Sequence, residues 1–115
     1  MEIPGYTLHG DYYLADEVIL NIAWKEAFKM KKVITLPNSK KVIARTLSKE
    51  ELLTIPLEER RCNLWYWASS LFDNDEAWYI TSYGTFYHHG INNTIHCNVR
   101  LGFHKNEIKQ FLDIE

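Results

Sequence analysis

Trp65-Tyr66-Trp67-Ala68-Ser69-Ser70, Ala77-Trp78-Tyr79-Ile80 and Gly84-Thr85-Phe86-Tyr87-His88-His89 are the three runs that decide the fold. They belong to a region, residues 63–103, in which aromatic, β-branched and aliphatic residues recur and in which Gly, Asn and Asp separate the runs. Short runs of this composition between turn residues are typical of a β-meander. The sequence therefore predicts an antiparallel sheet, around which the other elements are organised.

The turn between the second and third runs decides which of their side chains share a face, because side chains alternate along a strand. A three-residue loop at 83–85, with its central glycine at positive φ, is expected to pair Ser82 with Phe86 and Ile80 with His88. A two-residue loop would place Ile80 and Phe86 on different faces, and we therefore reject it.

A loop at residues 90–93 is expected to return the chain, so that Tyr87 pairs with His96 and Phe86 with Cys97. The inward face then carries Trp78, Ile80, Phe86, Ile95, Cys97, Val99, Leu101 and Phe103. The opposite face carries Tyr79, Thr81, Tyr87, His89, Thr94, His96, Asn98 and Arg100. Because phenol, imidazole and guanidinium groups both stack and hydrogen-bond, this outer face is the predicted recognition surface.

Length and composition predict a single domain, residues 1–115, that can bury a core without disulfides or metals. Aromatic residues make up 14% of the chain, which favours a compact β-rich fold over a helical bundle. A net charge of −2 and a pI near 6.2 argue against a nucleic-acid partner, since such proteins usually carry a basic surface. Without a signal-peptide pattern or an apolar run of about 20 residues, we expect a cytoplasmic protein with no membrane partner.

The residues before the sheet predict one main helix, from Asp16 to about Lys31, with acidic residues at its start and basic residues at its end. Its apolar side chains recur at helical spacing and are expected to face the core. They are Val18, Ile19, Ile22, Ala23, Ala27 and Met30 or Phe28.

Shorter elements follow. Residues 33–45 predict a β-hairpin, because a Pro-Asn-Ser-Lys turn lies between two β-branched runs. Ser48-Lys49-Glu50-Glu51 is a capping box that starts a short helix, which is expected to end before Pro56. Residues 57–61 predict one more helical turn with a solvated, mixed-charge face, and residues 104–112 predict a last amphipathic helix.

No combination of residues in the sequence marks a catalytic site, so we expect a protein that is not an enzyme and that needs no cofactor. His89 and His96 leave a metal site open as an alternative, but a third ligand would have to come from a distant loop. Cys62 has no marked partner base, and Cys97 on the inward face is interpreted as an inert thiol. The acidic run 73–76 lacks the glycine and the distal glutamate of an EF-hand and predicts a turn.

Several of these pieces, taken in order, resemble the carboxy-terminal signature of bacterial and phage proteins with the C-type-lectin fold. They are Tyr66-Trp67-Ala68-Ser69-Ser70, Ala77-Trp78-Tyr79-Ile80, Gly84-Thr85-Phe86-Tyr87 and Asn98-Val99-Arg100, about a third of the chain with the turns between them. The family includes relatives of the formylglycine-generating enzyme and the variable proteins of retroelements. The resemblance implies an α+β fold whose irregular antiparallel sheet displays an aromatic and polar surface for proteins or small polar molecules. Leu101 stands where the family often has proline, and the cysteine pair of the oxidase branch and the calcium motifs of animal lectins are absent, so neither activity is carried over.

The sequence thus predicts a non-enzymatic binding module that recognises a protein partner, since aromatic residues and arginine dominate interface hot spots. The expected binding residues are Tyr66, Asp73, Asp75, Tyr79, Tyr87, His89, Asn92, His96, Asn98 and Arg100. One specific form of this hypothesis is a phage-encoded inhibitor of a host defence enzyme. The alternatives are a small-molecule or nucleotide-binding protein, or an enzyme, that uses the same His, Tyr and Arg side chains, and a structural subunit; the oligomeric state stays open.

Overall fold

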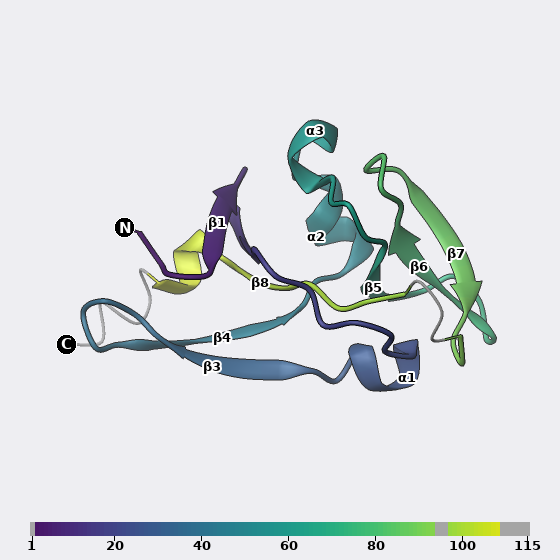
Figure 1. Cartoon of the computed structure of the whole chain (residues 1–115), viewed down its shortest axis with the longest axis horizontal. Coiled ribbons are helices and arrows are strands. Elements are labelled where there is room, and N and C mark those ends of the chain that lie inside the picture. The colour runs from purple at the N-terminus through teal and green to yellow at the C-terminus, as the bar shows by residue number, and fades with distance from the viewer. Residues whose placement is uncertain (1, 94–96, 109–115) are drawn as a thin grey trace.

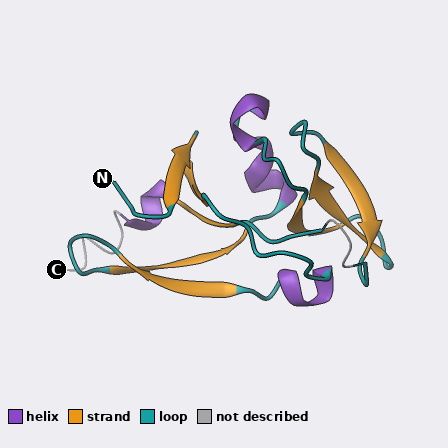
Figure 2. Ribbon diagram, viewed as in Figure 1, coloured by secondary structure: helices purple, strands orange, loops and turns teal. Residues whose placement is uncertain are grey.

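Two antiparallel sheets and several short helices make up the described part of the chain, residues 2–93 and 97–108 of a computed structural model (Figure 1). The larger sheet has the strand order β1 (Tyr6–His9), β2 (Tyr12–Ala15), β8 (Leu101–His104), β4 (Lys41–Thr46) and β3 (Lys31–Thr35). The smaller sheet has the order β5 (Tyr66–Leu71), β6 (Glu76–Ile80) and β7 (Phe86–Gly90). The helices are α1 (Trp24–Ala27), α2 (Lys49–Leu53), α3 (Leu57–Arg60) and a helical turn at residues 105–108. The predicted α+β class is confirmed at this level, with strands predominating over helices (Figure 2).

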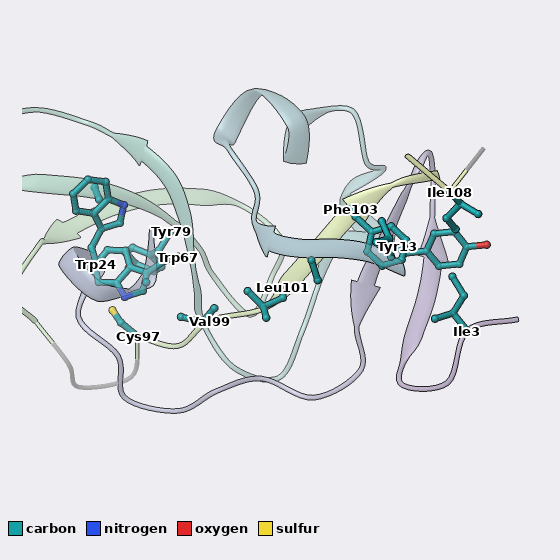
Figure 3. Packing of buried hydrophobic residues seen from close by; sticks show 14 of the residues in the cluster. Ile3, Tyr13, Trp24, Trp67, Tyr79, Cys97, Val99, Leu101, Phe103 and Ile108 are labelled. Carbon is teal, nitrogen blue, oxygen red and sulfur yellow. The ribbon is translucent and has the colours of Figure 1, made fainter. Parts of the chain in front are cut away.

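The main hydrophobic core runs from one sheet to the other (Figure 3). At one end Trp67 of β5 packs near Cys97, and at the other end Phe103 stacks on Tyr13 with ring centroids 5.2 Å apart. Val99 lies between these two groups and is fully buried. The segment that carries Cys97, Val99 and Phe103 therefore joins the two sheets through one continuous apolar core.

Both faces of the small sheet contribute to a core. Trp67 and Tyr79 pair across β5 and β6 and belong to the main core. Tyr66 and Ile80, which also pair, lie on the opposite face in a second cluster with Leu52 of α2. Three residues each of β5 and β6 are buried, whereas β7 has no buried residue, and this positions the candidate site described below.

The predicted helix from Asp16 to Lys31 is wrong over most of its length, because only Trp24–Ala27 is helical. Residues 16–23 are not helical and instead lie against the last part of the chain. Ile19 and Val99 exchange two backbone hydrogen bonds of 2.8 Å each. These bonds use the amide and carbonyl groups that a helix would have paired within itself.

Asn21 explains why the helical pattern is interrupted. Its φ is 53°, outside the right-handed helical region, and its amide donates to Oδ1 of Asn98 at 3.0 Å. The apolar residues that were expected to form one buried stripe are accordingly split, and Ile19 and Leu20 are exposed.

The loop between β6 and β7 comprises residues 81–85, so Ile80 pairs with Phe86 and the predicted pairing of Ile80 with His88 is wrong. The difference is a shift of two residues, and two is the side-chain period of a strand. The predicted grouping of Trp78, Ile80 and Phe86 on one face is therefore confirmed.

Cys97 does not pair with Phe86, which corrects the predicted meander. Its carbonyl accepts a hydrogen bond of 3.0 Å from the amide of Ile22, and the chain then continues into β8, between β2 and β4 of the larger sheet. The predicted positions of Thr94, Ile95 and His96, including the pairing of His96 with Tyr87, lie outside the described residues.

Local signals were predicted correctly. Ser48 caps α2: its hydroxyl accepts from the Glu51 amide at 3.1 Å, and its own amide donates to Glu51 Oε1 at 2.9 Å. The hairpin of β3 and β4 and the helical turn after Pro56 are both present. In the acidic turn, Oδ1 of Asp73 accepts hydrogen bonds of 2.8 Å from the backbone amides of Asp75 and Glu76. No helix in the described ranges is long and apolar enough to cross a bilayer.

Candidate functional site at the edge of the small sheet

The structure divides the predicted binding residues between interior and surface. Tyr66, Tyr79, Asn98 and Arg100 are buried, with exposed fractions of 1%, 6%, 2% and 8%. Asp73, Asp75, Tyr87 and Asn92 are exposed, His89 is half-buried, and His96 lies outside the described residues. The expected outward orientation of Tyr79, Asn98 and Arg100 is therefore wrong, and contacts inside the protein account for each of them.

Arg100 is held in the interior by main-chain and aromatic contacts. Its Nε donates to the carbonyl of Ala15 at 2.9 Å, and its guanidinium carbon lies 5.4 Å from the centroid of the Tyr66 ring. The Tyr66 hydroxyl donates to the carbonyl of Arg60, and burial raises the pKa of Tyr66. These two side chains connect β2 to β5 and are covered, so they do not offer a partner the polar face that the sequence predicts.

Tyr79 and Asn98 also have structural roles. The Tyr79 ring stacks on Trp65 at 5.0 Å and meets Trp67 edge-on at 6.3 Å, and burial raises its pKa. Asn98 accepts from the amide of Asn21 through Oδ1 and donates to the carbonyl of Trp65 through Nδ2 at 2.7 Å. Buried polar groups need such partners, and here they hold the chain crossing between the sheets in place.

The hydrogen bonds at the two ends of the β6–β7 pair show which main-chain groups of β7 face β6. The Thr81 amide donates to the Thr85 carbonyl at 2.8 Å, and the Ile91 amide donates to the Asp75 carbonyl at 3.0 Å. In an antiparallel pair, residues that exchange hydrogen bonds alternate with residues that do not. The odd-numbered residues of β7 therefore face β6, and the even-numbered residues face away from it.

The outward main-chain groups belong to Phe86, His88 and Gly90, and we call them the β7 edge. Among the described residues, no strand pairs with this side of β7, although the Gly90 carbonyl accepts from the Asn93 amide at 3.0 Å. Figure 1 shows β7 at the extreme end of the molecule, with β6 as its neighbour. A strand in this position offers amides and carbonyls to another chain.

Aromatic rings lie beside the β7 edge. The imidazole of His88 stacks on Phe72 with centroids 3.7 Å apart and planes 6° apart, and on Tyr87 at 4.9 Å and 9°. Trp78 meets the same imidazole edge-on at 5.7 Å. Nδ1 of His88 lies 2.6 Å from Oε1 of Glu76, which fixes the ring orientation. The result is a band of rings whose outer members, Phe72 and Tyr87, reach solvent.

Sequence reasoning missed Phe72 and Tyr83, which are exposed aromatic side chains near this edge. Phe72 directly precedes the acidic turn, and Tyr83 lies in the loop that enters β7. Turns are at the surface, so a large ring within a predicted turn was a signal that could have identified both.

The residues considered above for metal binding or nucleophilic chemistry include His89 and Cys97. Within residues 2–93 and 97–108, no three His, Cys, Asp or Glu side chains lie close enough to hold a metal ion. Nε2 of His89 lies 2.8 Å from Nδ2 of Asn93. Burial raises the pKa of the Cys97 thiol to about 11, so that it is protonated and a weak nucleophile at neutral pH.

A surface cleft of about 420 Å³ lies elsewhere, between the amino-terminal turn and residues 15–19. Lys32, Val99 and Leu101 complete its lining, and none of the predicted binding residues is part of it. The β7 edge is thus the free side of a strand in the described part of the chain and is not part of this cleft. None of the protein-family models, curated proteins or solved structures matches the chain, so the site is interpreted from its own geometry.

Proposed function

We propose that the chain is a non-enzymatic binding module that recognises a protein partner by adding an extended segment of that partner to β7. The observation that carries the proposal is the outward orientation of the Phe86 and His88 main chain, with no described strand beside it. In this mode of recognition, main-chain hydrogen bonds supply affinity and side chains beside the edge supply specificity.

A comparison with β1 and β3, the two edge strands of the larger sheet, supports the proposal. β3 begins with two exposed lysines, Lys31 and Lys32, and β1 has four residues and follows Pro4 and Gly5. Lysine, proline and shortness are devices by which proteins protect sheet edges from pairing. β7, with the sequence Phe-Tyr-His-His-Gly, has neither lysine nor proline.

The surroundings of the edge define the chemistry of the segment. Phe72 and Tyr87 offer ring faces and edges to an aromatic or aliphatic side chain. Asp75 is exposed at the end of β6 that pairs with Gly90 and Ile91, where it favours a basic residue of the partner. The expected partner segment is therefore extended, with apolar side chains and one lysine or arginine.

Amide hydrogen exchange of the free chain tests the geometry directly. We expect the amides of Phe86 and His88 to exchange fast and those of Tyr87 and His89, which face β6, to be protected. The four amides lie in one strand and share its local stability, so the protected pair is an internal control. If the Phe86 and His88 amides are equally slow in the monomer, the edge is already covered and the proposal is refuted.

Photo-crosslinking tests recognition. A photoreactive amino acid in place of Tyr83 is expected to capture a partner, and the same amino acid in place of Leu53, exposed on α2, is the control. A segment of the captured protein is then added to the free chain, and the amides of Phe86 and His88 are expected to become protected. Capture without this protection would show a partner that docks in another way.

The fold family, the inhibition of a host enzyme and the cytoplasmic location are also proposals. The C-type-lectin-type architecture is supported by the order of tryptophan-containing strands in the small sheet and by the amino-terminal hairpin pairing with β8. Inhibition of a host enzyme by a phage protein, acting in the cytoplasm, is proposed as one specific form of recognition through the β7 edge. A partner found by crosslinking that is a host enzyme, with activity that falls when the chain is added, would support the inhibitor hypothesis.

A further inference from the structure

The hairpin of β3 and β4 presents one of its faces to solvent. Val33 pairs with Ile43, and these side chains are 61% and 44% exposed. Val42 and Ala44, which alternate with Ile43 along β4, are buried in the main core. Figure 1 shows this hairpin along one border of the molecule, away from β7. Two β-branched side chains therefore occupy the middle of a strand face that no described element covers.

Charge is strongly separated along the chain. Residues 27–49 contain seven lysines and arginines and no acidic residue, whereas the remaining residues contain six basic and 15 acidic residues. The small net charge of −2 thus hides a cationic hairpin on an otherwise acidic protein. Such a separation creates a local positive potential that attracts negatively charged partners.

Lysines surround the two exposed apolar side chains. Lys31 lies two positions before Val33, and Lys41 lies two positions before Ile43, so strand alternation places all four side chains on one face. Lys31 and Lys41 have no carboxylate partner among the described residues. Arg45 differs, because two carboxylates already pair with it.

We propose that this face, Lys31, Val33, Lys41 and Ile43, docks a protein surface that has an apolar centre and acidic residues around it. An apolar centre with a polar rim is the usual composition of a protein interface. A nucleic acid fits less well, because the middle of the face carries aliphatic side chains and no ring on which a base can stack. This surface is independent of the β7 edge, and the inference does not depend on the function proposed above.

A synthetic peptide in which Asp or Glu alternates with Val or Ile is the probe, added to the isotope-labelled full chain. We expect saturable amide shifts confined to residues 31–35 and 41–45, and affinity that falls as salt is raised. A peptide with the same charges but with Ser in place of Val and Ile is expected to bind about tenfold more weakly. A single-stranded oligonucleotide and anionic vesicles, at equal charge, are the competing probes.

Two variants assign the binding to the face. Lys41→Glu is expected to weaken binding of the peptide that contains Val or Ile about fivefold or more. Lys25→Glu makes an equal charge change at an exposed residue of α1 and is expected to bind this peptide about as tightly as the wild type does. The double variant Val33→Thr, Ile43→Thr keeps β-branching and charge but removes apolar surface. Its affinity for the peptide that contains Val or Ile is expected to fall to the affinity of the wild type for the Ser-containing peptide.

Three results would overturn the inference. The first is equal binding of the two peptides, and the second is tighter binding of the oligonucleotide or the vesicles. The third is salt-sensitive self-association of the wild type that Lys41→Glu abolishes, since the occupant would then be a second copy of the chain.

Discussion

Replacement of Glu51 by glutamine is expected to remove much of the dependence of stability on acidic pH. Glu51 accepts two hydrogen bonds from Arg45, of 2.8 and 2.6 Å, and one of 2.9 Å from the Ser48 amide. Burial alone raises the pKa of this carboxyl, but these donors outweigh burial and lower the pKa from 4.5 to about 2. Folding therefore favours the ionised form.

The magnitude follows from proton linkage. A pKa that falls from 4.5 to about 2 corresponds to about 3.4 kcal/mol at most. The Glu51 side chain is 23% exposed, and solvent screening reduces the expected contribution to about 2 kcal/mol. Because the folded-state pKa is the lower one, this stability is complete above the unfolded pKa of 4.5 and is lost as the pH falls toward 2.

Urea unfolding, followed by tryptophan fluorescence at several pH values between 7 and 2, measures the effect. Glu51→Gln is expected to unfold with a free energy about 2 kcal/mol lower at pH 7 and with a difference near zero at pH 2. Glu50→Gln removes an exposed carboxylate from the same helical turn and is the control. A wild type and a Glu51→Gln variant whose stabilities fall in parallel below pH 5 would refute the assigned role of Glu51.

Further predictions concern the cap, two glycines and the cysteines. Ser48→Ala removes the acceptor for the Glu51 amide and is expected to lower the free energy of unfolding by about 1 kcal/mol in the same assay. Gly84→Ala is expected to lower the free energy of unfolding by about 2–4 kcal/mol, because φ is +86° and a Cβ would lie 2.7 Å from the Leu57 carbonyl oxygen. Gly90→Ala is the control and is expected to lower it by less than about 1 kcal/mol, since nothing lies within 4 Å of the added Cβ. Equal losses of stability in the two variants would contradict this prediction. Iodoacetamide at pH 8 is expected to alkylate half-buried Cys62 but not Cys97, whose pKa is raised to about 11 by burial, and mass spectrometry of the native chain that finds Cys97 modified first would contradict its burial.

Elements that depend on neighbouring residues were predictable from the sequence. The capping box of Ser48 and Glu51 uses groups three positions apart, and the β3–β4 hairpin depends on the turn between its strands. The grouping of Trp78, Ile80 and Phe86 was also predictable, because an error of two residues in the loop leaves side-chain parity unchanged. The sequence is enough to predict an element when the groups that form it lie close together in the chain.

Elements that depend on residues far apart in the sequence were not predictable in this way. The charges and spacing of residues 16–31 satisfy the rules for a helix, yet Asn21 is held by Asn98, 77 positions away, and Ile19 pairs with Val99. The turn residues after β7 gave no sign that the next described segment passes to β5 and β8 instead of pairing with Phe86. A tertiary contact can override helix propensity, which amounts to a fraction of a kcal/mol per residue.

The polar face was predicted on the assumption that every polar side chain on one side of the sheet seeks water, and the buried arginines show why that assumption fails. Arg60 donates to the carbonyls of Gly84, Leu52 and Ile55, at 2.6, 3.3 and 3.1 Å, and Arg100 donates to that of Ala15. Buried carbonyls outside regular ladders need donors, and a long guanidinium supplies several from one side chain. Polar residues near β5 and β6 are therefore used inside the protein, because both faces of those strands are covered. No described strand pairs with the outer side of β7, and Phe72 and Tyr87 are exposed, so we propose that its outward amides and these two rings meet a partner.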